Sequence, residues 1–185
     1  MVTTQNKVDV VIGSWGSYNE CNSRALGSKW LCFNDFDSWE DIEAELKREG
    51  FELEGIDEEL FIQDYEGFDG GFNCDYMHPK TLFEILKNSG VLDNENTFEK
   101  MEAFIEVRSW NDFVERVEND GTCWDDCIYL YKGYDVYDYG EEKMKMCYTI
   151  PDYLDRYIDY KQYGQDDIDN GYAEEYSEGI IEIAD

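Results

Sequence analysis

Residues 38–50 read SWEDIEAELKREG, and this stretch carries the local signals of an amphipathic helix. Trp39, Ile42 and Leu46 are spaced three and four residues apart, which places them on one helix face. Ser38 precedes the apolar run as an N-cap residue, two basic residues occupy the last turn, and Gly50 follows as a terminator. The stretch therefore predicts a helix that packs one face against neighbouring structure.

Short apolar runs on both sides of this helix predict the strands that it packs against. Residues 8–12 begin with Val8, Asp9 and Val10 in apolar–polar alternation, and residues 30–33 form a second apolar run. Residues 60–62 supply a third run after the helix. One helix with three short strands predicts an N-terminal α+β unit with an antiparallel sheet over residues 1–67.

Residues 68–103 predict a helical middle unit. A Gly70-Gly71 turn opens it, and Pro79 suits the first turn of a helix that ends at Gly90. The apolar positions Leu82, Phe83 and Leu86 lie on one face of that helix. Residues 97–101 predict a further short helix.

Residues 104–185 predict a C-terminal α+β unit. We expect strands at residues 104–107, 128–131 and 179–183, a helix capped by Ser109, and a single helix over residues 151–163. The chain has two prolines and no Gly/Ser-rich run, so no flexible linker separates the units. The fold class is therefore α+β, with three small units arranged end to end in an elongated chain.

Two stretches resemble one another: residues 38–42 read SWEDI and residues 109–113 read SWNDF. In this interpretation both follow a short apolar strand and both precede an aromatic strand. Either a degenerate internal duplication or two independent capped amphipathic helices explains the likeness, and the sequence leaves both open.

Charge sets this chain apart, because 45 Asp and Glu against 15 Lys and Arg give a formal net charge of −30. The acids recur from Asp9 to Asp185 among aromatic and aliphatic residues, so they coat a folded body and do not form a tail. Proteins that bind nucleic acids or acidic membranes carry the opposite charge. The partners to expect are basic surfaces, metal cations or the DNA-binding groove of another protein.

The sequence predicts a cytoplasmic protein with reduced thiols. Neither a secretory signal nor an apolar stretch of membrane-spanning length is present, and the six cysteines are then expected to be free.

Carboxylates line the outer faces of three predicted helices. Asp152, Asp155 and Asp159 at i, i+3 and i+7 would form a row with rises of about 4.5 and 6 Å, comparable with the roughly 3.4 Å per nucleotide of a DNA strand. The other helical candidates are Glu40, Asp41, Glu43 and Glu45 after Ser38, and Asp112, Glu115 and Glu118 after Ser109. Any acidic helix with one buried face also shows its acids to solvent, so for a single helix that plainer explanation suffices. Across the whole chain we favour the interpretation that the carboxylates are exposed because a function needs them, since a net charge of this size opposes folding.

No motif indicates catalysis, a cofactor or a metal. Two acidic stretches lack the Gly that an EF-hand loop needs at its sixth position, and Cys123 and Cys127 have no second cysteine pair at zinc-finger spacing. His78, the single histidine, precedes a predicted helix, where a capping or surface role is expected. Nucleotide-binding glycine loops are absent. The expected function is binding without catalysis, with no cofactor and no metal.

Several stretches together resemble the ArdA antirestriction proteins. Residues 12–19 (IGSWGSYN) with Trp30 are similar to that family's first strand, Tyr-Asn loop and Gly-x-Trp strand, with one extra residue between Gly27 and Trp30. Residues 61–68 (FIQDYEGF) are the most specific match, and residues 131–135 (YKGYD), 150–154 (IPDYL) and 157–160 (YIDY) also fit. The likeness extends from about Val10 to the C-terminus. Asp64 and Glu66 of the FIQDYEGF motif complete the candidate acidic surface.

The resemblance implies an elongated α+β homodimer that joins through its C-terminal part and belongs to a mobile genetic element such as a conjugative transposon or plasmid. It implies mimicry of bent B-form DNA, by which the protein occupies the DNA-binding groove of a type I restriction–modification enzyme and inhibits it. Thirty charges match roughly 50 Å of duplex at about 1.7 Å per charge, and a dimer would match roughly 100 Å, or about 30 base pairs.

Three other functions stay open from the sequence. An acidic Ca²⁺-responsive or basic-protein-binding module would use the carboxylates directly. An acidic enzyme would need a pocket with perturbed carboxylates. A salt-adapted protein would need no binding partner for its charge.

Overall fold

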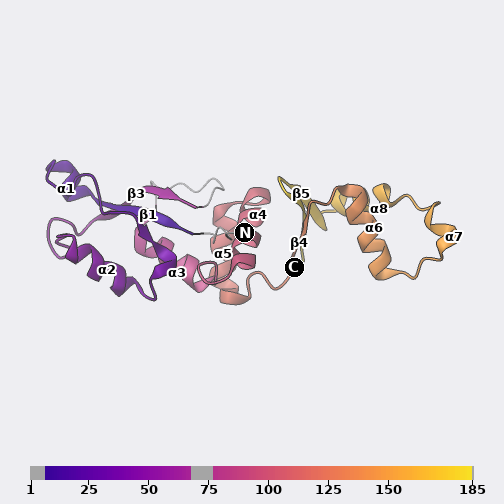
Figure 1. Cartoon of the computed structure of the whole chain (residues 1–185), viewed down its shortest axis with the longest axis horizontal. Coiled ribbons are helices and arrows are strands. Elements are labelled where there is room, and N and C mark those ends of the chain that lie inside the picture. Colours follow the sequence, from indigo (N-terminus) through magenta and orange to yellow (C-terminus); the bar gives the residue numbers. More distant parts are fainter. Residues whose placement is uncertain (1–6, 68–76, 185) are drawn as a thin grey trace, which may run out of the picture.

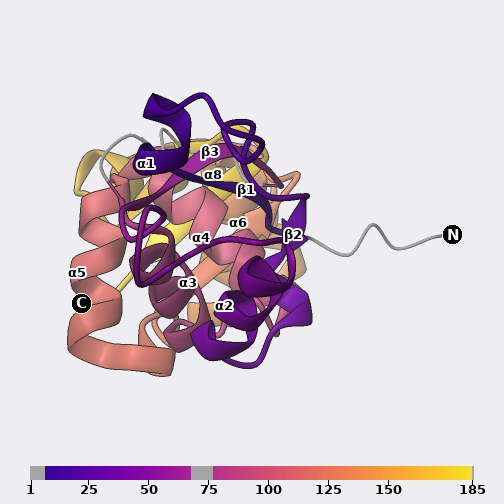
Figure 2. The same cartoon turned by 90° about the vertical axis from the view of Figure 1, so that its left-hand side faces the viewer.

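The computed structural model describes residues 7–67 and 77–184, and these form an elongated α+β body (Figure 1). A three-stranded sheet lies toward one end, a group of helices lies in the middle, and a second three-stranded sheet with its helices lies toward the other end. Viewed along the long axis, these parts lie one behind another (Figure 2). The predicted fold class is confirmed. The Gly70-Gly71 turn lies outside the described residues.

The N-terminal sheet has the order β2-β1-β3, and both pairings are antiparallel. Its strands are β1 (Asp9–Ser14), β2 (Leu31–Cys32) and β3 (Leu60–Glu66). The short helix α1 (Trp15–Asn19) follows β1 directly, and a 3₁₀ turn, η1 (Phe33–Asp35), follows β2. Helix α2 (Trp39–Arg48) buries Trp39, Ile42 and Leu46, as predicted.

Three helices form the middle of the chain: α3 (Pro79–Asn88), α4 (Glu95–Val107) and α5 (Trp110–Asp120), followed by the 3₁₀ turn η3 (Gly121–Cys123). The predicted strand at residues 104–107 is wrong, because these residues are the last turn of α4. Phe98, Met101 and Ile105 are buried at helical spacing, and Phe104 is buried beside them. A four-residue run with three apolar residues and one acid, as here, fits a strand or a helix equally well when it is considered alone.

The C-terminal sheet has the order β4-β6-β5, again antiparallel, from β4 (Ile128–Lys132), β5 (Ala173–Tyr176) and β6 (Gly179–Ile183). Three helices join β4 to β5: α6 (Val136–Cys147), α7 (Asp152–Asp155) and α8 (Tyr160–Asp169). The predicted single helix over residues 151–163 is wrong. Asp159 has a non-helical backbone, and its side chain accepts a hydrogen bond from the Gln162 amide, so it begins a new helix.

The main hydrophobic core is continuous from Val8, just before β1, to Ile181 in β6, and a smaller cluster holds Tyr139, Ala173 and Ile180. The boundaries at residues 67 and 103 stay a prediction. The likeness between residues 38–42 and 109–113 extends to the caps, since Ser38 and Ser109 each accept a bond from the amide three residues on. The elements before them differ, because the second stretch follows a helix and not a strand.

Candidate acidic interaction surface

The candidate carboxylates lie on the outside of the molecule. Nine of the twelve are exposed and three are half-buried, and they come from α2, β3, α5 and the segment from α7 to the start of α8. The exposed ones are Glu40, Asp41, Asp64, Glu66, Asp112, Glu115, Glu118, Asp152 and Asp159, and the half-buried ones are Glu43, Glu45 and Asp155.

On α2 most of the candidate acids also stabilise the helix. Asp41 and Ser38 form a reciprocal capping box at its N-terminus. Glu43 accepts a hydrogen bond of 2.8 Å from the Trp39 indole and lies 3.9 Å from the Lys47 ammonium. Glu45 pairs with Arg48. Glu40 is the α2 candidate whose carboxylate has no partner among the described residues.

On β3 an irregularity sets the direction of the two candidate acids. The pairing of β3 with β1 skips Gln63, because Ile62 lies opposite Ile12 while Asp64 lies opposite Val11. Such a bulge interrupts strand alternation and redirects side chains. Ile62 is buried and Tyr65 packs against the core, whereas Asp64 and Glu66 are both exposed.

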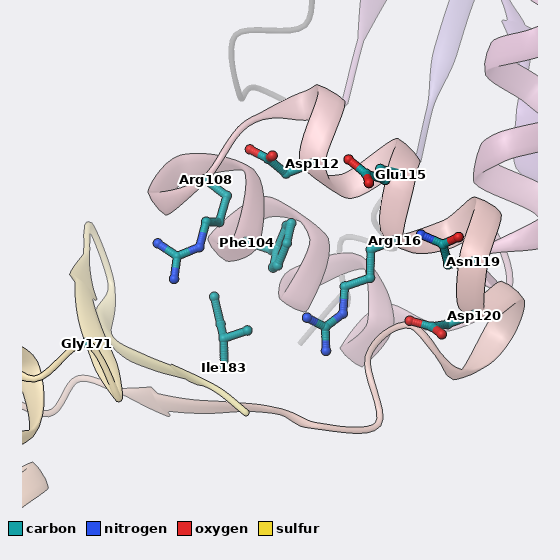
Figure 3. Close-up of a pocket in the computed structure, with 9 residues that line it drawn as sticks. All are labelled: Phe104, Arg108, Asp112, Glu115, Arg116, Asn119, Asp120, Gly171 and Ile183. Carbon is teal, nitrogen blue, oxygen red and sulfur yellow. The ribbon is translucent and has the colours of Figure 1, made fainter. Parts of the chain in front are cut away.

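On α5 the three candidates are spaced three residues apart. Asp112 belongs to the N-terminal cap with Ser109, while Glu115 and Glu118 are exposed and make no ion pair among the described residues. Asp112 and Glu115 lie on the rim of an open cleft of about 430 Å³ between α5 and the C-terminal sheet (Figure 3).

Two arginines also line this cleft, and both have partners within the chain. Arg108 pairs with Glu174 of β5. The Nε of Arg116 donates to the Trp124 carbonyl at 2.8 Å, and its guanidinium lies 5.8 Å from the centre of the Phe104 ring. The cleft therefore lies between the middle helices and the C-terminal sheet, and its two arginines are held by partners within the chain (Figure 3).

At the far end of the chain, the predicted row of three aspartates on one helix is wrong. Asp152 and Asp155 lie in α7, whereas Asp159 caps α8. Asp155 accepts a hydrogen bond of 2.6 Å from the Tyr160 hydroxyl and lies 3.7 Å from the Lys145 ammonium. The break has a packing cause, because Tyr160 is buried and α8 turns back against α6.

One acid that the sequence reasoning missed is structural. Asp57 is fully buried and accepts hydrogen bonds from the hydroxyls of Ser14 and Ser17, from the Glu52 amide at 2.8 Å and from Arg24 Nε at 3.0 Å. Burial alone would raise the pKa of Asp57, but these hydrogen bonds and the Arg24 charge outweigh it, so the pKa lies below its ordinary value. Forty-three residues separate Ser14 from Asp57, so no local pattern could reveal this contact.

The sequence reasoning also missed two groups of exposed apolar side chains at opposite ends of the molecule. Trp15 and Tyr18 lie in α1, at one end of the long axis (Figure 1). A second group lies around α7, at the other end. It comprises Tyr153 and Leu154 of α7, with Tyr148 before that helix and Tyr157 after it.

Within residues 7–67 and 77–184, no three His, Cys, Asp or Glu side chains are grouped so that they could hold a metal ion. His78 caps α3, accepting a bond of 3.2 Å from the Lys80 amide, as expected from its position. Burial and the nearby Lys80 charge lower the pKa of His78. In the same part of the chain, no helix has the length and apolar character needed to cross a membrane.

Comparison with known protein families shows a match over most of the chain. The family model described as "Antirestriction protein (ArdA)" matches residues 10–182, almost the whole chain. No curated protein matches the sequence.

Proposed function

Because the chain belongs to the ArdA family of antirestriction proteins, we propose that it inhibits type I restriction–modification enzymes by occupying their DNA-binding groove. It acts in this proposal as a DNA mimic in the cytoplasm, and it serves the mobile genetic element that carries it. The role is one of binding, with no catalytic step and no cofactor.

The observation that carries the proposal is the spread of unpaired carboxylates along an elongated body. Among the nine exposed candidate acids, five have carboxylates with no hydrogen bond or ion pair among the described residues, and they occur on α2, β3, α5 and α7. They are Glu40, Glu66, Glu115, Glu118 and Asp152. Negative charge thus extends along the long axis, as it does along a duplex.

A DNA-binding groove presents Lys and Arg side chains that neutralise phosphates. Carboxylates held on helices and strands can meet the same cations without ordering a flexible chain, which lowers the entropic cost of binding. Because the interaction is between charges, inhibition should weaken as salt rises. Since the charge is distributed, neutralising the acids of one helix should have little effect.

The functional unit in this proposal is a homodimer, with the second copy covering the exposed apolar group around α7. Tyr153 and Tyr157 are 69% and 72% exposed there, and large aromatic side chains at this exposure are typical of interface anchors. The dimer would carry the charge of roughly 30 base pairs. Sedimentation should give a dimer for the wild type and a monomer for Tyr157→Glu, which places a charge in the contact.

The test is DNA cleavage by a type I enzyme in the presence of the purified protein. We expect full inhibition near stoichiometric protein. Inhibition should be lost progressively as salt rises from 50 to 200 mM, a range over which the Debye length falls about twofold. A polyglutamate peptide of matched total charge is the control, because it has the charge without the scaffold. If cleavage continues at tenfold excess with several such enzymes, or if the peptide inhibits equally, the proposal is wrong. Methylation by the same enzymes is measured in parallel.

A further inference from the structure

Three aromatic rings form an exposed cluster at the α1 end of the molecule. Trp15 stacks on Phe61 of β3, with ring centres 4.2 Å apart and planes inclined by 23°. Tyr18 meets both rings edge-on, at 6.0 Å from Trp15 and 6.4 Å from Phe61. Trp15 is 45% exposed and Tyr18 is 54% exposed, although such rings ordinarily contribute to a core. We call these three residues the tip cluster.

The scaffold beneath the tip cluster is rigid. Ser14 caps α1 by accepting a hydrogen bond from the Ser17 amide, and both hydroxyls donate to the buried carboxylate of Asp57. The Trp15 amide donates to the Glu59 carbonyl at 3.0 Å. A side chain at Gly16 would collide with the Ile56 carbonyl, so α1 lies directly against the loop before β3. Rings held in this way lose little conformational entropy on binding.

The charges around the tip cluster are negative and unpaired. Glu20 directly follows α1, and Glu58 and Glu59 lie in the segment that contacts it. All three are exposed, and their carboxylates form no ion pair within the described residues. The nearby cation, Arg24, is already bound to Asp57. Residues 7–67 as a whole carry sixteen acids against five basic residues.

Aromatic faces beside free carboxylates suit one kind of side chain in particular. A guanidinium stacks on an indole or phenol ring through its flat face and donates to a carboxylate through its edge. A neutral apolar partner would leave the flanking carboxylates without a counter-charge, and an acidic partner would be repelled.

We propose that the tip cluster is a binding site for arginine side chains on the surface of the partner protein. This inference rests on the proposed function for the identity of the partner, because a DNA-binding groove supplies arginines. The chemistry of the contact does not depend on the proposed function. The distributed acids attract the partner over a long range, and the rings add a short-range contact that salt screens little. The salt-dependent part of the affinity therefore comes from the distributed acids, and the rings contribute a part that depends little on salt.

The first experiment tests the contact alone, with a hexa-arginine peptide as the probe. The indole NMR signal of Trp15, identified by its loss in Trp15→Phe, should shift on titration. The double variant Trp15→Leu/Tyr18→Leu keeps apolar packing on Phe61 but removes both exposed rings. It should bind the peptide about threefold to tenfold more weakly, whereas Trp15→Phe should lose much less. Tyr172→Leu, which removes a ring that is 65% exposed in another part of the chain, is the matched control and should bind as the wild type does.

The second experiment measures inhibition of a type I enzyme by the same variants over a range of salt concentrations. The double leucine variant should be about tenfold weaker, with an unchanged slope of log affinity against log salt, because no charge is lost. Glu20→Gln/Glu59→Gln should reduce that slope.

Circular dichroism verifies folding. If the double variant does not fold, Tyr18→Leu alone provides the comparison, since more than half of that ring is exposed. Equal peptide affinity for wild type and ring variants, or an unmoved Trp15 signal, would overturn the inference. If the peptide binds through Trp15 while no restriction enzyme is inhibited, the proposed function fails and the inference stands.

Discussion

Replacing Asp57 by alanine should destabilise the protein more than the loss of any exposed candidate acid. The carboxylate is fully buried and receives four donors, from Ser14, Ser17, Glu52 and Arg24. Its removal leaves two hydroxyls and one amide without this acceptor in the interior, and it leaves the half-buried Arg24 guanidinium without its counter-charge.

The burial of this ion pair indicates the approximate size of the effect. Breaking a buried ion pair by removing one partner costs about 3–5 kcal/mol. The Arg24 side chain keeps 21% of its exposure and so can recover some solvation, which favours the lower end, about 3 kcal/mol. In a chain of this length, each kcal/mol lowers Tm by about 2–4 °C, so Asp57→Ala should lower Tm by roughly 10 °C.

The assay is thermal and urea unfolding followed by circular dichroism, with Asp64→Ala as the matched control. Asp64 is exposed and accepts a single hydrogen bond, from the neighbouring Tyr65 amide, so its loss should change stability by less than about 0.5 kcal/mol. Asp57→Asn should fall between the two, because it keeps an acceptor and loses the charge. A Tm for Asp57→Ala within 2 °C of the control, on a scale where roughly 10 °C is expected, would refute the reasoning.

Three further predictions concern pH, packing and salt. The folded state holds the pKa of Asp57 below its ordinary value of 3.8, so the stability that this carboxylate provides is present above that pH and is lost as pH falls through the folded pKa. The difference in unfolding free energy between wild type and Asp57→Asn should therefore shrink from pH 6 to pH 3, values about two units above and one below the ordinary pKa. A constant difference would contradict this prediction. A side chain at Gly140 would collide with the Tyr160 carbonyl where α6 crosses α8, so Gly140→Ala should cost about 1–3 kcal/mol in urea unfolding, whereas Gly55→Ala, with its nearest atom at 3.6 Å, should be tolerated. Salt should raise Tm, because it screens the repulsion among 30 excess negative charges, and a Tm that falls from 50 to 500 mM NaCl, about a threefold change in Debye length, would exclude net repulsion as a destabilising force.

Sequence reasoning succeeded where the decisive signal is local. The caps at Ser38 and Ser109, and the apolar spacing in α2, α3 and α5, lie within a few residues of one another, and those helices are present. Strands β1, β3, β4 and β6 also occur where short apolar runs predicted them.

It failed where packing decides between two local possibilities. Residues 104–107 are helical because Phe104 and Ile105 continue the buried face of α4, which a four-residue window does not include. Helix α6 went unpredicted because it buries only Tyr139 and Gly140, so its apolar periodicity is weak, although its capping box of Asp135 and Asp138 is visible in the sequence.

For the candidate surface, exposure was predictable and pairing was not. Amphipathic spacing places the acids of α2 and α5 on the outer face, and they are found there. The spacing of Trp39 and Glu43 permits their hydrogen bond without requiring it. The contacts of Asp155 with Tyr160 and Lys145 depend on the turn between α7 and α8, which the sequence reasoning had treated as continuous helix.

The large acidic excess and the stability of the fold are partly reconciled by where the acids occur. Asp41, Asp112, Asp138 and Asp159 all lie at helix N-termini, where the partial positive charge of the helix end and the free amides stabilise a carboxylate. These acids contribute to folding, so their charge costs less than the same charge in mid-helix. Glu115 and Glu118 lie beyond the first turn of α5 and have no such compensation, so their repulsion is a net cost to the isolated protein. A basic groove would remove that cost on binding. Salt should therefore act in opposite directions on the two equilibria, since the screening that stabilises the free protein also weakens its attraction to a cationic partner.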